Sequence, residues 1–376
     1  MPADGMDNRL RVLHLIHVLR STNSQYNEHS LPVMDERDIA LCTYFTPQLT
    51  PPPQIRVFHG NDTVRGVFKA LREALDASEY DAIHAHSPQT GVLMIMAMIA
   101  WLRWGLRRRT VYTVHDSFYD YKTRNKLLMI PGLAVFARVV FCSHAAYESL
   151  PTILKRLVGR RARVVQNGAD IRRIDRVIDG IEPTRDETFT VLSIGRLEPV
   201  KDPVVVVKAF AQASDPKSQL VFIGEGDLRP ELERVIAAAD LGDHVTLTGL
   251  IERDEVFRHL IHSDVFISTS HGEGLPVAVM EAMACSVPVI LSDIPPHREF
   301  QADPALVPLV EPGNVEGFAR ELARLRSMSR DERAAIGREC RYLVATRFSL
   351  ENMNQGYEAI YRETSRVGPG SESADA

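Results

Sequence analysis

The stretch VFISTSHGEGLPVAVMEAMACSVPVILSD, residues 265–293, has the pattern of a strand, a glycine-containing loop, a helix and a second strand. The runs VFISTS and PVILSD are short and rich in Val, Ile and Leu, whereas the apolar run between them is long enough for a helix. Because a strand, a helix and another strand in this order form a parallel βαβ unit, the stretch predicts an α/β fold.

The same alternation runs through the whole chain. A polar segment, 167–188, separates a first set of strand-like runs from a second set. We therefore predict two doubly wound, Rossmann-like domains that face each other across a cleft, with ligands at the carboxyl ends of the strands. The first set is 10–19, 38–45, 55–60, 81–86, 110–116, 137–143 and 162–168, and the second is 188–195, 219–224, 244–249, 265–270, 288–293 and 305–310.

The length of 376 residues exceeds what one hydrophobic core usually serves, which also favours two domains. The predicted limits are residues 1–168 for an N-terminal domain and 169–347 for a C-terminal domain. A further helix is expected over residues 348–364, with Ser349 as its N-cap. The tail, 365–376, is small and polar, and we expect it to be disordered.

Composition argues against several classes of protein. The N-terminal MPADGMDNRL lacks the apolar core of a secretory signal. The longest apolar stretch, from Gly91 to Leu102, is shorter than the roughly 20 residues that a membrane-spanning helix needs. The four cysteines form no CxxC pair, and they predict reduced thiols in a cytoplasmic protein.

The two halves of the chain differ in charge. Residues 1–167 hold 21 Lys and Arg against 14 Asp and Glu, a net +7, and the remainder holds 23 against 35, a net −12. The cations gather in RWGLRRR from Arg103, YKTRNK from Tyr121 and KRLVGRRAR from Lys155. These clusters indicate either solvated helix ends or a surface for anionic lipid or phosphate. Nucleic acid is disfavoured, because the second half is acidic and aromatic residues are only 7% of the chain.

Two glutamates mark the opening stretch. Glu273 lies between two glycines, and Glu281 lies in an apolar helix whose first turn we expect to contain Pro276. A buried carboxylate needs partners, and no Lys or Arg lies within one helical turn of Glu281. A sugar diol offers two hydroxyl donors to one carboxylate, but a distant Arg or a helix that surfaces at Glu281 explains the residue equally well. The backbone amides of Gly274 and Leu275, at the positive end of the helix, predict a phosphate site.

Charged residues and glycines follow two other strands. In SIGRLEPVKD (193–202), Arg196 directly follows a strand and Lys201 comes five residues later, where both would neutralise a diphosphate. The alternative is a pair of surface cations bound to Glu198 or Asp202. Asp202 and Pro203 then have the pattern of a helix N-cap and first position. A Gly-x-Gly turn, a weaker signal, follows the next strand at Gly224, Glu225 and Gly226.

Together these motifs resemble those of glycosyltransferase family 4, the retaining nucleotide-sugar transferases of GT-B fold. The resemblance covers nearly the whole chain. It rests on Glu273-x7-Glu281 in EGLPVAVME, on GRLEPVKD, on GEGD and on the closing RFSLENM…YEAIY helix. It implies a GT-B architecture in which the last helix crosses back to the N-terminal domain.

The resemblance also implies roles for the residues at the matching positions. Arg196 and Lys201 would hold the diphosphate, and Glu281 would bind the ribose hydroxyls. Glu273 and the amides of Gly274 and Leu275 would bind the transferred sugar, and the turn from Gly224 to Gly226 would belong to the donor site. No divalent metal is expected, because the Arg/Lys pair and the helix dipole would stabilise the leaving diphosphate.

Histidines end two strands of the first domain. His84 and His86 share one face of a strand, and His115-Asp116 ends another. As residue types they form a ligand-like set, so a metal-dependent hydrolase built on these four residues is one alternative. The resemblance instead places His115 beside the reacting sugar without metal, as a catalytic residue together with Glu273. His86 and Asp116 are then on the acceptor side, although Asp116 also suits a loop cap and the two strand histidines suit ordinary polar strand ends.

One loop departs from the family pattern. Many members have a Gly-Gly pair after the first strand, whereas this chain has LRSTNSQYNEHS (19–30), without glycine. We expect Ser21, Asn23 and Ser24 to supply hydroxyl and amide groups on the acceptor side instead. The loss of the glycines also allows a second alternative, a non-catalytic nucleotide-sugar-binding protein of the same fold.

The predicted function is the transfer of a hexose from a nucleoside diphosphate sugar to an acceptor hydroxyl, with retention at the anomeric carbon, in cell-envelope polysaccharide or glycolipid synthesis. The expected partners are the nucleotide-sugar donor and a carbohydrate or lipid-linked acceptor. The basic first half and the apolar GVLMIMAMIAWLRW (91–104) favour peripheral attachment to the inner face of a membrane. An apolar run of this length is more often part of a core.

Overall fold

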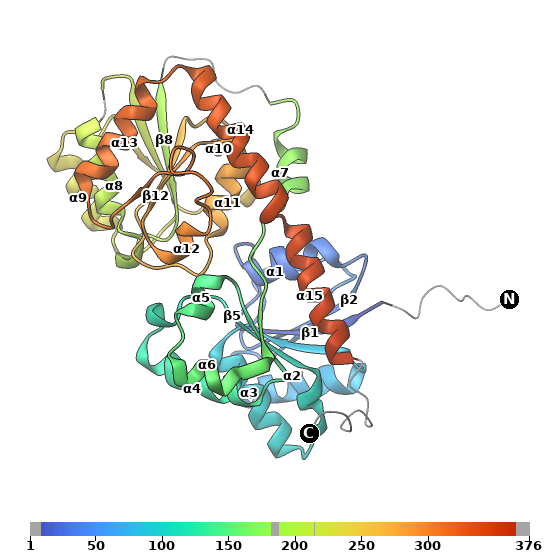
Figure 1. Ribbon diagram of the computed structural model, residues 1–376. Helices are drawn as coiled ribbons and strands as arrows, with labels where there is room; N and C mark the ends of the chain where they lie inside the picture. The colour runs from blue at the N-terminus through green and yellow to red at the C-terminus, as the bar shows by residue number, and fades with distance from the viewer. Residues whose placement is uncertain (1–8, 182–187, 214, 366–376) are drawn as a thin grey trace. The chain divides into compact units, whose positions relative to one another are not determined.

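The structure is a computed structural model that describes residues 9–181, 188–213 and 215–365 (Figure 1). Contacts divide the chain into unit 1, Met1–Gln166 with Met353–Ala376, and unit 2, Asn167–Asn352. The expected limits at 168/169 and 347/348 lie two and five residues from these divisions. The tail expected to be disordered lies outside the described residues from position 366 onward.

Unit 1 is built on a seven-stranded parallel sheet of order β3-β2-β1-β4-β5-β6-β7. The central strands are buried on both faces, which explains why they read as continuous apolar runs. The strands are β1 (Arg11–Ile16), β2 (Asp38–Thr43), β3 (Arg56–His59), β4 (Ala82–Ala85), β5 (Thr110–Val114), β6 (Arg138–Phe141) and β7 (Ala162–Val164).

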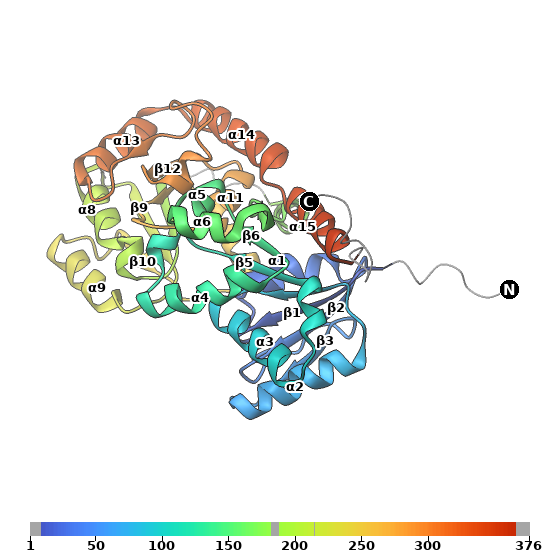
Figure 2. The same ribbon diagram turned by 60° about the horizontal axis from the view of Figure 1, so that its bottom comes forward.

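Helices cover both faces of this sheet (Figures 1 and 2). Neighbouring residues of β5 identify the two sides, since successive side chains of a strand point to opposite faces. Tyr112 lies against Gly91 of α3 and Gly132 of α4, whereas Thr113 is hydrogen-bonded to Tyr357 of α15. The helices of unit 1 are α1 (Ser24–His29), α2 (Val64–Ala77), α3 (Pro88–Ala100), α4 (Thr123–Val135), α5 (His144–Glu148), α6 (Thr152–Val158) and α15 (Leu350–Ser365).

The last helix, α15, joins the two units in sequence and packs within unit 1. Its predicted N-cap is confirmed, because the Oγ of Ser349 accepts a hydrogen bond from the Asn352 amide over 3.2 Å. Tyr361 reaches His84 of β4, and Arg37 donates to the Asn354 carbonyl and pairs with Glu358. The helix therefore completes the face of the sheet on which the histidines lie.

Unit 2 contains a six-stranded parallel sheet of order β10-β9-β8-β11-β12-β13, so both sheets have the predicted number of strands. The two Rossmann-like units are thereby confirmed. The strands are β8 (Phe189–Ile194), β9 (Ser218–Ile223), β10 (Val245–Leu247), β11 (Val265–Ser268), β12 (Val289–Ser292) and β13 (Leu309–Val310).

The helices of unit 2 include one that the sequence did not indicate. The polar segment after residue 167 forms α7, which is capped by the side chain of Asp170 and buries Ile174. The helices are α7 (Ile171–Ile178), α8 (Pro203–Ala213), α9 (Arg229–Ala238), α10 (Arg253–Ile261), α11 (Val277–Ala284), α12 (Pro295–Arg298), α13 (Val315–Ser327) and α14 (Arg330–Arg347).

The apolar run at 91–104 forms α3 and the turn after it. Met94, Ala97 and Met98 are buried in the core of unit 1, whereas Met96 and Ile99 are exposed. In the described part of the chain, no helix combines the length and apolarity needed to cross a membrane. The four cysteines are unpaired thiols in the cores, as expected from their spacing.

Candidate active site

In unit 2, the loops that follow β8 and β11 meet at the carboxyl ends of these strands. Thr269 donates its hydroxyl to the carbonyls of Lys201 and Asp202 over 3.0 and 2.9 Å. The His271 amide donates to the Val200 carbonyl over 2.8 Å, and Ser292 of β12 donates its hydroxyl to the Ser270 carbonyl. The two strongest sequence motifs are thus fixed to each other by hydrogen bonds to backbone carbonyls.

Lys201 and Glu273 form the central ion pair of this edge. The Lys201 ammonium donates to Glu273 Oε1 over 2.5 Å, and Ser270 donates its hydroxyl to the same oxygen over 2.7 Å. Burial favours the neutral acid, but the charge and hydrogen bond of Lys201, together with Ser270, hold the pKa of Glu273 below its usual value. Glu273 is therefore an anion at neutral pH, and the predicted diphosphate cation contacts the predicted sugar-binding carboxylate.

Arg196 and Asp202 lie on the same turn but are more exposed. Arg196 pairs with Glu198 over 2.8 Å, the surface pairing left open above, and its side chain is 68% exposed. Asp202 does not follow the predicted N-cap geometry, because its φ is +47° and its carboxylate is hydrogen-bonded to the His271 ring. Its backbone carbonyl, rather than its side chain, accepts a bond from the first turn of α8, at the Val205 amide. The guanidinium of Arg196 is therefore exposed on the surface of this turn.

Glu281 has a protein partner, so a ribose is not required to explain a carboxylate at this buried position. Arg253, at the start of α10, donates to Glu281 Oε1 over 2.5 Å, and both side chains are largely buried. The distant arginine that we left as an alternative is therefore present. A carboxylate has two oxygens and about four acceptor positions, so this pair leaves capacity for hydroxyl donors at the same carboxylate.

The helix that carries Glu281 starts one residue later than expected. Pro276 is its N-cap, not its first residue, and Glu281 is the fifth residue of α11. Leu275 is buried, and its carbonyl accepts a hydrogen bond from Asn167 over 2.9 Å. Gly274 and Leu275 therefore lie in a fixed loop directly before α11, and their amides precede the N-terminus of the helix, which is the positive end of its dipole.

The Gly-x-Gly turn has a structural task in this unit. A Cβ on Gly224, whose φ is +140°, would lie 2.0 Å from the Gly195 carbonyl oxygen, and one on Gly226 would lie 2.4 Å from the Leu197 carbonyl oxygen. Both glycines allow the loop after β9 to pack against the loop after β8. Glu225 pairs with Arg229 of α9. The donor-binding role of this turn stays a prediction, since packing alone accounts for the glycines.

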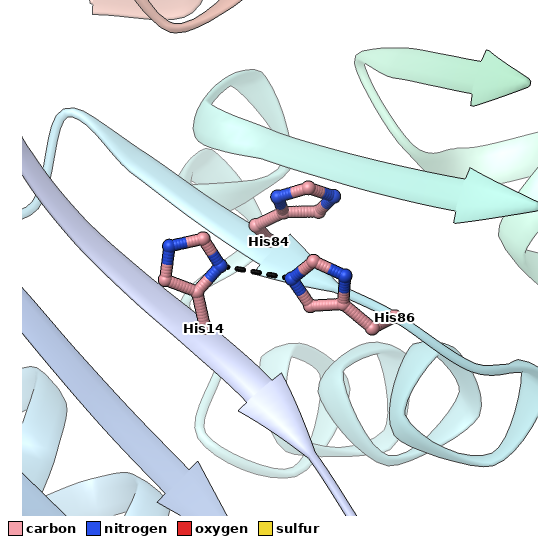
Figure 3. Close-up of side chains that lie close together, drawn as sticks. All are labelled: His14, His84 and His86. Carbon is pink, nitrogen blue, oxygen red and sulfur yellow. Dashed lines mark hydrogen bonds between the residues drawn. The ribbon is translucent and has the colours of Figure 1, made fainter. Parts of the chain in front are cut away.

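In unit 1, five histidines gather on the face of the sheet that α15 covers. His14 of β1 is hydrogen-bonded to His86 over 2.8 Å (Figure 3), and His86 to His115 over 3.1 Å. His84 uses both ring nitrogens, one to Tyr361 at 2.8 Å and one to Thr113 at 2.7 Å. His29 of α1 packs its ring against His86 with 5.0 Å between centroids. The predicted pair of strand histidines is therefore part of a larger network.

Burial keeps this network neutral. It lowers the pKa of His115 to about 4, and burial together with the nearby Arg37 lowers that of His14 to about 3. Burial and the surrounding histidines hold the pKa of His29, His84 and His86 well below the usual value. Neutral imidazoles both donate and accept, so the network can orient hydroxyl groups without carrying charge.

The residues of the metal-dependent alternative are only partly brought together. Among the described residues, the group that could hold a metal ion is His14, His84 and His86, with ligand atoms within 4.8 Å of one another. His115 is linked to this group through His86, whereas Asp116 is exposed in the turn after β5. Both nitrogens of His84 already bond hydroxyl groups, which favours a hydrogen-bonded network over a metal centre.

The acceptor-side residues predicted in the glycine-free loop form the start of α1. Asn23 is the N-cap, accepting from the Tyr26 amide over 3.0 Å and donating to the Val18 carbonyl over 3.2 Å. The Ser21 carbonyl accepts from Asn27, and Ser24 is the first helical residue. A capped helix thus replaces the expected irregular loop, so the asparagine side chain is occupied locally.

Sequence reasoning missed three contributors to these edges. Arg253 lies 28 residues before Glu281, and only the packing of α10 against α11 brings it close. His14 stands in an apolar strand, where an isolated histidine was a usable signal. His297 is buried and close enough to Glu273 and Lys201 to interact with their charges; burial lowers its pKa to about 4, and its ring bonds to Ser292.

Two family models match the chain, one for each half. Residues 33–173 match the model described as Glycosyltransferase Family 4, and residues 176–341 match the model described as Glycosyl transferases group 1. The chain is a family 4-type glycosyltransferase. The resemblance inferred from the motifs is therefore confirmed, as is the GT-B fold class.

Known proteins agree with this assignment. The chain is 25% identical to a UDP-Gal:α-D-GlcNAc-diphosphoundecaprenol α-1,3-galactosyltransferase of Escherichia coli, across 86% of this chain and 84% of that protein. It is 31% identical to the amylovoran biosynthesis glycosyltransferase AmsK of Erwinia amylovora, across 43% and 44%.

A solved structure supports the fold of this glycosyltransferase. Anabaena HepE in complex with UDP and glucose superposes with a TM-score of 0.75 at 18% identity, and the match covers 94% of this chain and all of HepE. Neither the family models nor these proteins support the metal-dependent hydrolase.

Proposed function

We propose that this glycosyltransferase moves a hexose from a nucleoside diphosphate sugar to an acceptor hydroxyl with retention at the anomeric carbon. The observation that carries the proposal is the pair of Lys201 and Glu273, a cation and an anion fixed at the carboxyl ends of β8 and β11. The complexes of HepE with UDP and glucose support a nucleotide-sugar donor.

The donor is held by charge and by hydroxyl recognition. Lys201 and Arg196 neutralise the diphosphate, and the exposed pair of Arg196 with Glu198 is weak enough to exchange for phosphate oxygens. Glu281 accepts hydrogen bonds from the ribose hydroxyls while Arg253 donates to one of its two carboxylate oxygens. Glu273 and the amides of Gly274 and Leu275 bind the sugar.

The reaction proceeds by attack on the face from which the diphosphate departs. The acceptor oxygen forms a bond to the anomeric carbon, the bond from that carbon to the phosphate oxygen breaks, and the hydroxyl proton passes to the departing phosphate oxygen. Lys201, Arg196 and the N-terminus of α11 stabilise the charge that develops on the diphosphate. No divalent metal is needed, because these groups already supply positive potential. His115 positions the sugar hydroxyls as a neutral imidazole.

The acceptor belongs to cell-envelope polysaccharide or glycolipid synthesis. Two relatives support this class, one named for a diphosphoundecaprenol acceptor and one for amylovoran. We favour a lipid-linked acceptor, and we place the enzyme in the cytoplasm at the inner face of the membrane.

A thermal-shift screen over nucleoside diphosphate sugars tests the donor site, because a ligand that binds only the folded state raises its melting temperature. We expect one donor to raise it in wild type and in Lys208→Ala, an exposed lysine of α8, but not in Lys201→Ala. Chelator should leave the shift unchanged. A chain that binds no nucleotide sugar, or binds one only with added metal, would contradict the proposal.

Product analysis then tests the reaction. Incubation with the bound donor and a panel of lipid-linked and soluble acceptors should give an α-linked product from an α-linked donor, as read by nuclear magnetic resonance. Donor binding without transfer to any acceptor would favour the non-catalytic alternative. Inversion at the anomeric carbon, or a covalent glycosyl-protein adduct in mass spectrometry, would overturn the same-face mechanism.

A further inference from the structure

We propose that the outer surface of α3, α4 and α6 is a docking surface for anionic lipid. These three helices lie side by side on the face of the unit 1 sheet opposite the histidines (Figures 1 and 2). We call their outer surface the α3–α4–α6 face. It differs from an ordinary protein surface in both its apolar and its charged residues.

Each helix of this face exposes apolar side chains at helical spacing. Residues three or four apart lie on the same side of a helix, so each exposed pair forms a short outward stripe. Ile153 is 75% exposed and Leu127 is 63% exposed, although both are large aliphatic side chains. A soluble monomer rarely gathers so many on neighbouring elements. The stripes are Met96 and Ile99 on α3, Leu127 and Ile130 on α4, and Ile153 and Leu157 on α6.

The same segment is strongly basic. Residues 88–169, which include α3, α4 and α6, contain 13 Lys and Arg but only three Asp and Glu, at Asp116, Asp120 and Glu148. Exposed cations stand next to the apolar stripes, at Lys122 and Arg124 around the start of α4 and at Arg156 and Arg160 in and after α6. No carboxylate lies within any of the three helices themselves.

Exposed aliphatic side chains and cations on one surface together favour anionic lipid as the ligand of the α3–α4–α6 face. Exposed aliphatic residues bordered by cations match the chemistry of a bilayer surface, in which acyl chains lie beneath anionic headgroups. A free phosphate ligand would leave the aliphatic stripes unexplained. A nucleic acid would leave the aliphatic stripes unexplained too, because bases stack on aromatic rather than aliphatic side chains.

The inference rests on the proposed function for its purpose, since a lipid-linked acceptor resides in a bilayer. Its test needs neither donor nor acceptor. Sedimentation of the full chain with vesicles measures binding to phosphatidylcholine alone and to phosphatidylcholine with about 30% phosphatidylglycerol, at about 50 mM salt. We expect wild type to bind the anionic vesicles and not the neutral ones.

Two double variants separate the contributions. Leu127→Glu with Ile153→Glu places carboxylates in the apolar stripes, and Arg124→Glu with Arg156→Glu reverses two cations. Each should lower the fraction bound by about tenfold or more, because charge at the bilayer surface and apolar insertion act together. The matched controls lie in unit 2, where Tyr342→Glu changes an exposed tyrosine and Lys208→Glu reverses an exposed lysine. Both controls should bind vesicles like wild type.

Three outcomes would overturn the inference. Wild type failing to bind anionic vesicles is one, and double variants that bind like wild type are another. The third is a self-associated wild type that Leu127→Glu with Ile153→Glu converts to a monomer, since the face would then be covered by a second copy. The nucleotide-sugar thermal shift, recorded on every variant, shows that each is folded and reports separately on the proposed donor site.

Discussion

The carboxyl edges of the two sheets both contain buried titratable side chains, but these are charged pairs in unit 2 and neutral rings in unit 1. In unit 2, each of two buried carboxylates is paired with a cation, Glu273 with Lys201 and Glu281 with Arg253. In unit 1, histidines stay neutral because burial lowers their pKa values, and they are hydrogen-bonded to one another and to hydroxyls. The edge of unit 2 therefore contains buried ion pairs, whereas the histidine network of unit 1 carries no charge.

The difference matches the chemistry proposed for each side. A diphosphate donor brings negative charge, so the unit that binds it must hold cations that a carboxylate keeps in place until the ligand arrives. A sugar hydroxyl brings no charge, and a neutral imidazole can donate to it or accept from it. Charged pairs are suited to exchange their partners, whereas the neutral network is suited to hold groups in position.

The largest expected effect comes from removing the cation of the donor edge. Lys201→Ala should lower the transfer rate by about 10²- to 10³-fold, since a lost transition-state contact to a developing anion costs this much. It should also destabilise the protein by on the order of 3 kcal/mol, because Glu273 is then a buried carboxylate without its cation. Steady-state kinetics and urea unfolding measure the two effects.

The variant Lys201→Ala with Glu273→Gln separates stability from catalysis. Neutralising the carboxylate should restore most of the lost stability, because no buried charge is left unpaired. It should not restore transfer. Recovery of transfer in the double variant would mean that Lys201 serves only to hold Glu273.

The second effect concerns the neutral edge and its dependence on pH. The folded-state pKa values of His14 and His115 are about 3 and about 4, against 6.5 in the unfolded chain. Below pH 6.5 the unfolded state therefore binds more protons, so stability is complete above this pH and falls as the pH drops toward 4. At about pH 5, each such histidine should lower the free energy of unfolding by about 2 kcal/mol relative to its value at neutral pH.

Urea unfolding at several pH values measures this dependence. His14→Gln keeps a polar side chain but cannot take up a proton. Between about pH 6.5 and pH 5, the free energy of unfolding should therefore depend less steeply on pH, by the contribution of one histidine. Glu273 does not interfere, because its pKa lies below the usual carboxyl value of 4.5. An unchanged slope in His14→Gln would show that the network is already open to protons in the folded state.

Much of this architecture could be predicted from the sequence. The number of strands in each domain and the capped last helix follow from local apolar patterns and from the cap residue Ser349. The motifs at 193–202 and 271–281 were expected to meet, because parallel strands end at one edge of a sheet. Local patterns also located Lys201 and Glu273 correctly at that edge.

Partners across the sequence could not be predicted in this way. The Arg253 contact depends on how two helices pack, which the residues around Glu281 do not encode. The histidine network combines residues from β1, β4, β5 and α15, and only the folded chain brings these elements next to one another. The Gly-x-Gly turn looked like a ligand loop because close backbone packing and ligand approach require the same absence of a side chain.

The third effect tests the shared role of Glu281. Glu281→Ala should weaken nucleotide-sugar binding by about tenfold, the loss expected for charge-assisted hydrogen bonds to two hydroxyls. It also leaves Arg253 without its carboxylate, so the melting temperature of the free protein should fall. Isothermal titration of Arg253→Ala, which keeps Glu281, provides the control. If both variants lose the same affinity, Arg253 and Glu281 act on the donor as a unit.

The smallest expected effect concerns the exposed cation of the donor edge. Glu198→Gln removes the partner of Arg196 without touching the buried pair, and exposed pairs are worth roughly 0–1 kcal/mol. Since Arg196 no longer has to leave a carboxylate, the variant should bind the nucleoside diphosphate up to about threefold more tightly, and added salt should reduce this gain. Titration calorimetry with the nucleoside diphosphate at two salt concentrations measures it. Weaker binding in Glu198→Gln would mean that the ion pair orients Arg196 toward the phosphates, so even the exposed cation would be preorganised as Lys201 is.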